Sequence, residues 1–220
     1  RLGPPLVLRT GEVVEVHEQL HRRHGLAGLW SHEETGNDWT FARDRRVAAW
    51  ARANGIPWQE SPNGGVQRRL RSRNGWAAEW ERRIAPLPLA EPEIAPVPGV
   101  ALGDLPAADT LGIAPDPCPG RQRGGRRRGE RALHTFLAGR GAGYMRGLSS
   151  PLSAETRCSR FSLALATGAL SLREVVHAVR GAQAEGSPVP GRDLASLDKR
   201  LHWHCHFVQK LESEPAIEFR

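Results

Sequence analysis

Cysteine is scarce in this sequence, and the three that it has, Cys118, Cys158 and Cys205, lie far apart. A small, odd and scattered set excludes a disulfide framework and favours a reducing compartment, so we expect a cytoplasmic protein. The sequence also lacks an apolar run near the ~20 residues that cross a bilayer. No stretch resembles a signal peptide. We therefore expect no membrane association.

Lysine is almost absent, because only Lys199 and Lys210 carry this side chain, and the net charge of +7 comes from arginine. Such a balance favours anionic partners, with DNA or RNA first and phosphate cofactors second. A genomic bias toward arginine codons is the alternative. The arginines gather in two clusters, and we expect either cluster to bind phosphate groups along a nucleic-acid backbone. The first cluster comprises Arg68, Arg69, Arg71, Arg73, Arg82 and Arg83, and the second comprises Arg121, Arg123, Arg126, Arg127, Arg128 and Arg131.

The 220 residues suffice for one large domain or two small ones with a real core. The sequence begins with Arg1 rather than methionine and stops at Arg220 just after an expected helix. Both ends resemble cuts, so we expect a fragment of a longer protein.

Residues 1–85 alternate short apolar runs with helical patterns, which is typical of βαβ units in a parallel sheet. We predict strands at 5–9, 26–30 and 56–60, and helices at 12–24, ended by Gly25, and at 40–54. The fold class predicted for this part is an incomplete, Rossmann-like α/β sheet.

Residues 86–128 are rich in proline, glycine and arginine and have no periodic apolar face, so we predict an extended linker. Residues 129–220 then follow an all-α pattern. We predict helices around Leu133–Leu137, at 156–167, after a capping box formed by Ser171 and Glu174, and from about 194 to 211.

The stretch "LHWHCHF", Leu201 to Phe207, admits two interpretations. A strand would align His202, His204 and His206 like metal ligands, whereas a helix would scatter them. The apolar stripe of Leu197, Leu201, Val208 and Leu211 extends beyond the histidines on both sides, which favours a helix and predicts no metal site.

In that helix His204 lies within the stripe, either as a satisfied core histidine or as a donor to a buried ligand. His202 and His206 point away from it, and we expect a solvated or partner-facing pair. The i, i+4 spacing would also suit a helical ligand pair, but the Glu of a zinc protease motif is missing between them.

Several segments in order resemble the DNA photolyase/cryptochrome family. "LWSHEETGNDWTFARDRRVAAWARANGIPWQE" and "GVQRRLRSRNGWAAEW" are similar to the later part of its N-terminal α/β domain. "GERALHTFLAGRGAGYMRGLSSPL" resembles the start of its helical flavin domain. The most specific segment, "CSRFSLALATGALSLREV", resembles the signature T-S-x-L-S-P-x-L-x-x-G-x-L-S-x-R, and "LHWHCHFVQKLE" resembles the helix that usually reads E-L-x-W-R-x-F.

The resemblance implies an FAD site lined by Tyr144, Cys158, Ser159, Arg160, Phe161 and Ser162. It also places His204 where the family usually has a flavin-contacting Arg, and Trp203 against the extruded pyrimidine dimer. Without the resemblance, "CSRFS" reads as an ordinary helix start and Trp203 as interhelical packing.

The departures from the family pattern weaken the case for dimer repair. Cys158, Phe161 and Leu163 replace the usual Thr, Leu and Pro. Arg200 stands where repair enzymes have a Glu that hydrogen-bonds the dimer. Neutral His204 is a poorer partner than Arg for a flavin phosphate or carbonyl.

The resemblance implies FAD-dependent, blue-light-driven repair of pyrimidine dimers in DNA by a monomer. A cryptochrome-like photoreceptor and a non-catalytic nucleic-acid-binding fragment are the alternatives. A folate- or deazaflavin-type antenna is also implied, with Glu33, Glu34 and Arg43 as candidates or else a solvated loop. The first strands and the C-terminal part of the helical domain are expected to be missing, so we expect these 220 residues alone neither to hold FAD nor to repair DNA.

Overall fold

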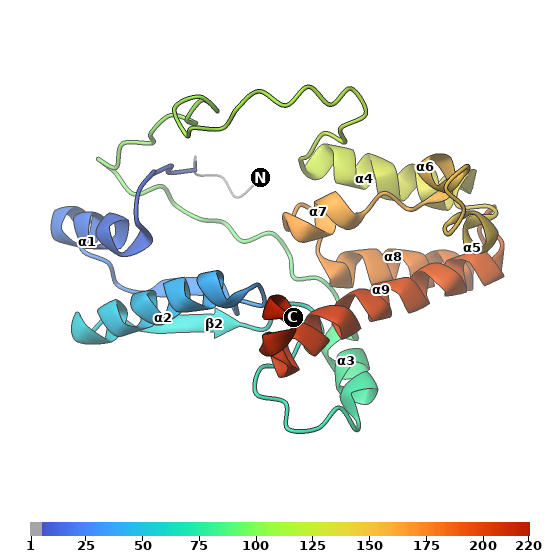
Figure 1. Cartoon of the computed structure of the whole chain (residues 1–220), viewed down its shortest axis with the longest axis horizontal. Helices are drawn as coiled ribbons and strands as arrows, with labels where there is room; N and C mark the ends of the chain where they lie inside the picture. Colours follow the sequence, from blue (N-terminus) through green and yellow to red (C-terminus); the bar gives the residue numbers. More distant parts are fainter. Residues whose placement is uncertain (1–5) are drawn as a thin grey trace. The chain divides into compact units, whose positions relative to one another are not determined.

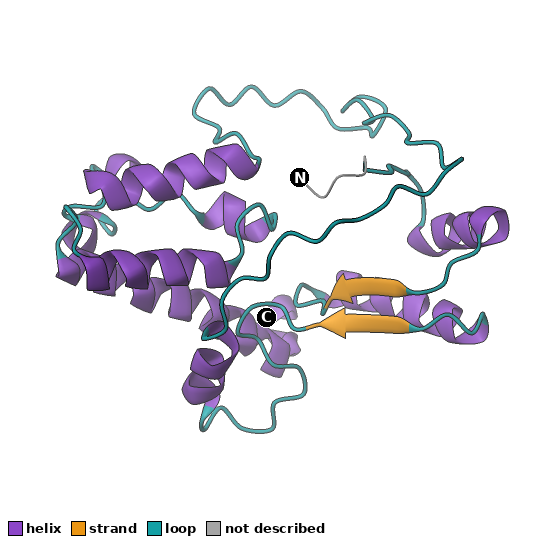
Figure 2. Ribbon diagram, turned by 180° about the vertical axis from the view of Figure 1, so that it is seen from behind, coloured by secondary structure: helices purple, strands orange, loops and turns teal. Residues whose placement is uncertain are grey.

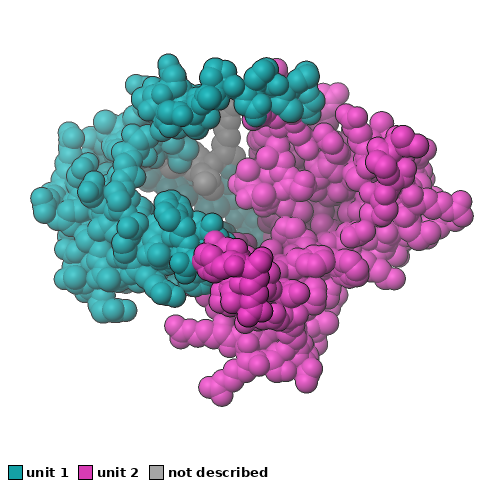
Figure 3. Space-filling view, viewed as in Figure 1, with its two compact units in different colours: residues 1–61, 89–120 teal, residues 62–88, 121–220 magenta. Residues whose placement is uncertain are grey.

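The computed structural model describes residues 6–220, and the chain divides into two compact units. Unit 1 comprises residues 1–61 and 89–120, and unit 2 comprises residues 62–88 and 121–220 (Figure 3). Each unit is therefore built from two separate stretches of the chain. The contiguous ranges 1–85, 86–128 and 129–220, expected as α/β domain, linker and helical domain, stay a prediction about domain roles.

Unit 1 is a small α/β unit in which helices alternate with strands. Its elements are α1 (Val13–His24), β1 (Leu29–His32), α2 (Asp38–Ala53) and β2 (Trp58–Ser61). The strands pair in parallel, with Leu29 opposite Trp58 and His32 opposite Ser61, and α2 joins them (Figure 2). This arrangement confirms the predicted α/β character of the N-terminal part.

Local capping explains where the helices of unit 1 begin and end. The Glu12 carboxylate accepts the N–H of Val14 at the start of α1, and Asn37 Oδ1 accepts the N–H of Thr40 at the start of α2. Gly25 has a φ of 70° after α1, a conformation that glycine adopts without a steric penalty.

The strand predicted at 5–9 is wrong for residues 6–9, which are irregular, while Pro5 lies outside the described residues. The Leu8 N–H donates to the Leu102 carbonyl at 2.6 Å, so this stretch bonds to an irregular segment instead of a sheet. The other two strands form later than predicted, at Leu29 and Trp58.

Unit 2 is helical throughout. It contains α3 (Trp76–Ile84), α4 (Arg126–Thr135), a π-helical turn (Phe136–Arg140), α5 (Tyr144–Gly147), α6 (Ala154–Arg157), α7 (Ser162–Ala166), α8 (Leu172–Glu185), α9 (Gly191–Ser213) and a 3₁₀ turn (Pro215–Phe219). The helix predicted at 156–167 is wrong, because residues 158–161 break it into α6 and α7. The capping box is confirmed, with the Ser171 hydroxyl accepting the Glu174 N–H at 3.1 Å.

The core of unit 2 lies between α8 and α9, which run side by side (Figure 1). Apolar side chains of both helices are fully buried there, together with Trp80 and Ile84 of α3: Val175, Val176, Val179, Leu194, Leu197 and Leu201. Each contributes about 1.5–3 kcal/mol on transfer from water. Burial of α3 explains why residues 62–88 belong to the helical unit.

The long helix α9 carries charged residues along its length. Across residues 6–220, no helix combines the length and apolar character that a bilayer crossing requires.

Candidate functional site

Tyr144, the first residue of α5, is buried at the centre of the candidate site. The Phe136 ring contacts the Tyr144 ring and the Phe161 ring edge-on, with centroids 5.4 and 5.6 Å apart. Gly143 precedes Tyr144 and has a φ of 81°, in the left-handed region. This conformation changes the direction of the chain just before α5 begins. The aromatic contacts and this turn fix the position of the phenol.

Asp193 at the start of α9 holds that turn. It is 1% exposed, and its two carboxylate oxygens accept the N–H of Gly143 at 3.0 Å and of Met145 at 2.8 Å. Hydrogen bonds to an ionised acceptor are stronger than neutral ones. Asp193 therefore positions Tyr144 although the two side chains are 49 residues apart in the sequence.

The loop between α6 and α7 presents unpaired backbone donors. Within residues 6–220, the N–H groups of Ser159, Arg160 and Phe161 have no hydrogen-bond acceptor. Arg160 has a φ of 64°, and Phe161 follows in the right-handed region at φ −87° and ψ −16°. Successive N–H groups in alternating left- and right-handed conformations form a concave anion-binding nest.

The carbonyl groups of the same loop are held by side chains. Arg140 donates to the carbonyls of Cys158 at 2.7 Å and Ser159 at 3.1 Å, and Gln122 donates to that of Arg160 at 2.7 Å. Burial and then the charge of nearby Arg160 lower the pKa of Arg140. Because these donors occupy the carbonyls, the loop keeps its shape while its N–H groups stay free.

The pKa of Tyr144 reports which groups surround its phenol. Burial raises this pKa most, and the positive charge of Arg200 and a hydrogen bond with the Ser159 side chain oppose the increase. Cys158 adds to the increase. The structure thus brings Tyr144, Cys158, Ser159 and Arg200 together from α5, the loop and α9.

Leu197 and Leu201 of the predicted stripe of α9 are buried in the core, and Val208 packs against it while partly buried. The buried side chains of α9 are Asp193, Leu194, Leu197, Leu201, Cys205 and Gln209. His204 is solvent-exposed, so the prediction of an inward-facing His204 is wrong. Desolvation by the surrounding protein still lowers its pKa.

The exposed side of α9 combines a cation with large aromatic rings. Trp203 is 50% exposed and Phe207 59% exposed, and the Arg200 guanidinium lies over the Trp203 ring at 5.3 Å. His204, one turn after Arg200, is exposed as well. Arg200 therefore neighbours both Tyr144 and Trp203.

His202 and His206 are not a solvated pair, which corrects that prediction. His202 contacts the rings of Trp76 and Trp80 edge-on at 4.8 and 4.7 Å, and His206 contacts Trp76 at 5.7 Å. With Trp203 and Phe207 they line a cavity of about 290 Å³. These two histidines are packing residues between α9 and α3.

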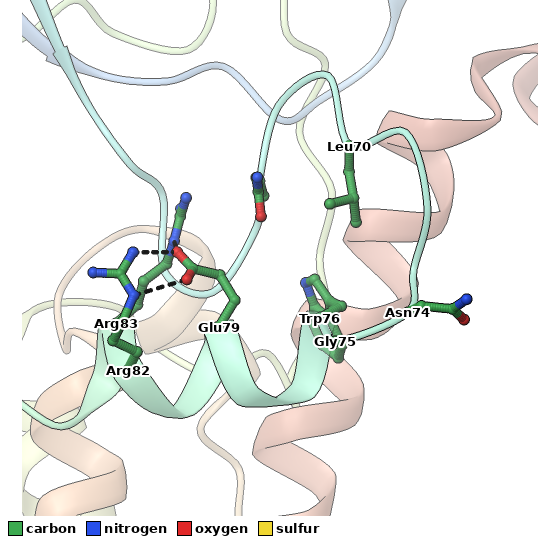
Figure 4. A pocket seen from close by; sticks show the side chains of 8 residues that line it. Leu70, Asn74, Gly75, Trp76, Glu79, Arg82 and Arg83 are labelled. Carbon is green, nitrogen blue, oxygen red and sulfur yellow. Dashed lines mark hydrogen bonds and ion pairs between the residues drawn. The ribbon is translucent and has the colours of Figure 1, made fainter.

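A second cavity, of about 400 Å³, lies at the start of α3 and includes residues of the first arginine cluster (Figure 4). Figure 4 shows Arg82 and Arg83 reaching the same carboxylate, Glu79, and both ion pairs measure 2.7 Å. These hydrogen bonds lower the pKa of Glu79 to about 2. One carboxylate offsets only one of these two cations, so the three groups keep a net charge of +1 at this cavity.

The residues considered for an antenna lie after β1 in unit 1. Glu34 accepts the N–H of Thr35 at 2.9 Å and of Gly36 at 2.6 Å, and pairs with Arg43 at 2.7 Å. These contacts are those of a capped turn. Over the part of the chain that the structure describes, no group of three or more His, Cys, Asp or Glu side chains is placed to hold a metal ion.

Most of the residues expected around the flavin lie close together in unit 2. Their burial and contacts differ from those that the sequence suggested. Phe161 is 1% exposed as a whole residue, so both its ring, which packs into the core, and its backbone are buried. Ser162 is exposed at the start of α7. The sequence interpretation missed Arg140 and Asp193, whose partners are distant backbone groups that leave no local signal.

Comparison with known proteins finds no matching family model and no matching curated protein. Among solved structures, the chain is similar to a bacterial class III photolyase from Agrobacterium tumefaciens, with a TM-score of 0.77 and 19% sequence identity. The match covers 98% of this chain and 47% of that one, so the chain spans about half the length of the photolyase. At this identity the likeness shows the fold alone: an N-terminal α/β part followed by a helical part, as in a photolyase.

Proposed function

We propose that the loop 158–162, Tyr144 and Arg200 form the phosphate-binding part of an FAD site in a light-driven DNA photolyase. The observation that carries the proposal is the run of free N–H groups at Ser159, Arg160 and Phe161. Unpaired backbone donors are uncommon in folded proteins and need a partner. The likeness to a photolyase makes the FAD diphosphate the fitting anion.

The residues present fit a diphosphate group. The nest supplies backbone donors, Ser159 supplies a hydroxyl, and Arg200 supplies a guanidinium whose charge reaches Tyr144. Arg200 was expected to contact substrate. Its position near Tyr144 supports a flavin-phosphate role, one helical turn before the neutral His204 that replaces the family's arginine.

Bound FAD, once reduced and excited by blue light, would supply the electron that splits a cyclobutane dimer. The chain's own residues would bind the flavin and the DNA substrate and orient them toward each other. Trp203 offers an exposed indole face on which an extruded base stacks, and base–aromatic stacking contributes about 1–3 kcal/mol. The proposed partner is DNA that contains pyrimidine dimers, and the proposed protein is a cytoplasmic monomer.

A cryptochrome-like photoreceptor is the second candidate, and Arg200 favours it. The family's repair enzymes place a carboxylate at this position, whereas a guanidinium over Trp203 cannot accept a hydrogen bond from a thymine. A photoreceptor would still bind the flavin but would not repair pyrimidine dimers.

The experiment measures FAD binding and light-dependent loss of cyclobutane dimers by the complete gene product, with R200Q as the variant. Charge-assisted hydrogen bonds contribute about 1.5–3 kcal/mol, so we expect R200Q to raise the FAD dissociation constant roughly 10- to 100-fold. K199Q removes the adjacent exposed cation and is the matched control, with no change expected.

Flavin binding with dimer loss supports the photolyase proposal. Flavin binding without dimer loss leaves the photoreceptor. A purified protein that binds no FAD contradicts both, and an equal loss of affinity in K199Q and R200Q contradicts the assignment of Arg200.

A further inference from the structure

Gln122 is an isolated anchor in an exposed stretch of chain that leads into α4. Every residue from 107 to 128 is exposed except Gln122, which is half-buried. Its side-chain amide donates to the Arg160 carbonyl, 38 residues away, at 2.7 Å. Three glycines surround this anchor, and a Cβ added to any of them would meet no atom within 4 Å: Gly120, Gly124 and Gly125. The hydrogen bond of Gln122 therefore fastens an otherwise loosely packed stretch to the loop between α6 and α7.

The acceptor of this bond belongs to a residue in an uncommon backbone conformation. Arg160 has a φ of 64°, and Arg69 is the other non-glycine residue with a positive φ within residues 6–220. A Cβ atom makes this left-handed conformation unfavourable. The loop therefore needs contacts that hold Arg160 in it.

Two side chains hold the peptide groups on either side of Arg160. Arg140 donates to the Ser159 carbonyl at 3.1 Å, and that peptide group also carries the N–H of Arg160. Gln122 holds the carbonyl of the next peptide group, which carries the N–H of Phe161. Because a peptide group is planar and trans, the position of its carbonyl fixes the direction of its N–H. The two bonds together determine the left-handed turn at Arg160.

Arg140 and Gln122 differ in how they are themselves held. Arg140 also donates to the Ala132 carbonyl at 3.1 Å and lies over the Phe136 ring at 5.4 Å, so neighbouring helical residues fix it. Gln122 lies in a glycine-rich stretch outside any helix or strand. Release of that stretch would free the carbonyl that Gln122 binds while Arg140 keeps its contacts.

We propose that Gln122 is a positioning residue of the FAD site, and that docking of residues 121–125 and binding of FAD strengthen each other. This inference rests on the proposed function, because both events act on the same phosphate-binding loop. Docked Gln122 keeps Arg160 left-handed, and successive left- and right-handed residues form the anion-binding nest. Gln122 binds a carbonyl and needs no contact with the flavin. By reciprocity, an anion bound in the nest favours the docked stretch.

The first experiment tests the anchor without flavin. Arg121 and Arg123 are exposed in the irregular stretch, so trypsin should cleave after both when the stretch is released. We expect Q122A to speed these two cuts in the complete gene product roughly 3- to 10-fold, the contribution of one hydrogen bond. Peptide mass spectrometry follows the cuts. Cleavage after exposed Arg71, in another loop of unit 2, provides the internal reference.

The second experiment adds FAD to the same proteins. Q122A should raise the FAD dissociation constant by the same factor, roughly 3- to 10-fold, because the two events are linked. FAD should slow the cuts after Arg121 and Arg123 in the wild type but not in Q122A. Q183A removes an exposed glutamine of α8 as the matched control, and we expect wild-type values in both experiments. Both variants should melt at the wild-type temperature.

The variant R160G separates positioning from a general structural role. Glycine adopts the φ of 64° found at Arg160 without a steric penalty. R160G removes a cation and binds FAD more weakly by itself, so the quantity compared is the ratio of dissociation constants with and without Gln122. In the R160G background, we expect Q122A to change the FAD dissociation constant less than about twofold.

Each outcome addresses a separate step. Unchanged cleavage after Arg121 and Arg123 in Q122A would overturn the anchor. Faster cleavage with an unchanged FAD dissociation constant would overturn the link to the flavin site and leave the proposed function standing. An equal effect of Q122A in the wild type and in R160G would show that Gln122 does not act through Arg160. A gene product that binds no FAD would contradict the proposed function and this link together.

Discussion

Two buried polar residues of α9 show how single side chains hold irregular loops of unit 2 in place. Asp193 accepts two N–H groups from the turn before α5. Gln209 accepts the N–H of Gln67 at 2.7 Å and donates to the carbonyl of Gln67 at 3.0 Å. Each satisfies backbone groups of a loop that has no regular structure of its own, which is how buried polar groups avoid a desolvation penalty.

Replacement of Asp193 by alanine tests this role. The N–H groups of Gly143 and Met145 would lose their acceptors, so we expect the free energy of unfolding to fall by about 2–4 kcal/mol. D198A is the control, because Asp198 pairs with partly exposed Arg180 at 3.1 Å and such pairs contribute about 0–1 kcal/mol.

Urea unfolding followed by far-ultraviolet circular dichroism measures both variants. A loss in D193A no larger than that in D198A would show that the carboxylate does not hold the turn.

Helices were the elements that the sequence predicted best, since apolar periodicity and caps are local signals. The capping box at Ser171 and the end of α1 at Gly25 both formed as expected. The phase of α9 was harder to predict. Its buried stripe continues from Leu201 to Cys205 and Gln209, and the polar Gln209 is buried only because distant Gln67 needs its amide.

The candidate site was predictable in composition but not in conformation. Periodicity suggested one helix over residues 156–167. The backbone N–H groups of the loop are free because residues 158–161 are not helical. Arg140 stabilises that break by binding two of its carbonyls. A long-range contact of this kind cannot be predicted from local residue preferences.

The interface between α9 and α3 should respond to pH through His202. Burial lowers its pKa most, Glu81 and Asp198 oppose this effect, and His206 and Arg180 add to it. Because the folded-state pKa lies below the unfolded value of about 6.5, the unfolded chain binds more protons at acid pH. Stability should therefore fall as the pH decreases below about 6.5.

The variant H202F keeps a ring against Trp76 and Trp80 but cannot be protonated. We expect it to lose less stability than the wild type between pH 7.5 and pH 5, by about 1.4 kcal/mol for each unit by which the pKa is lowered. Denaturant unfolding at both pH values measures the difference. H134Q removes an exposed histidine of α4 as a control, and an equal pH response in H202F and H134Q would refute the role of His202.

At the scale of the whole molecule, the two units interleave along the chain. Composition suggested a boundary near residue 85, because proline recurs from there onward. The structure instead assigns residues 62–88 to the helical unit. The cause is the burial of Trp76, Trp80 and Ile84 against α8 and α9, a tertiary contact that composition does not reveal.

This interleaving predicts how the chain behaves after one cut. Glu93 is exposed in an irregular stretch and is followed by Ile94, so a glutamate-specific protease should cleave there early. Residues 62–88 and 121–220 would then lie on different pieces while still sharing one core. We expect both pieces to elute together in size-exclusion chromatography and to separate only in denaturant.

The packing of α3 supplies the reason for that expectation. Trp80 is 0% exposed and Ile84 is 2% exposed, and removal of α3 would expose both together with the α8 and α9 side chains that they cover. Replacement of Trp80 by alanine in the cleaved protein should weaken this association, whereas replacement of exposed Trp39 should not. Free elution of the N-terminal piece from the unmutated, cleaved chain would show that residues 62–88 do not belong to the helical core.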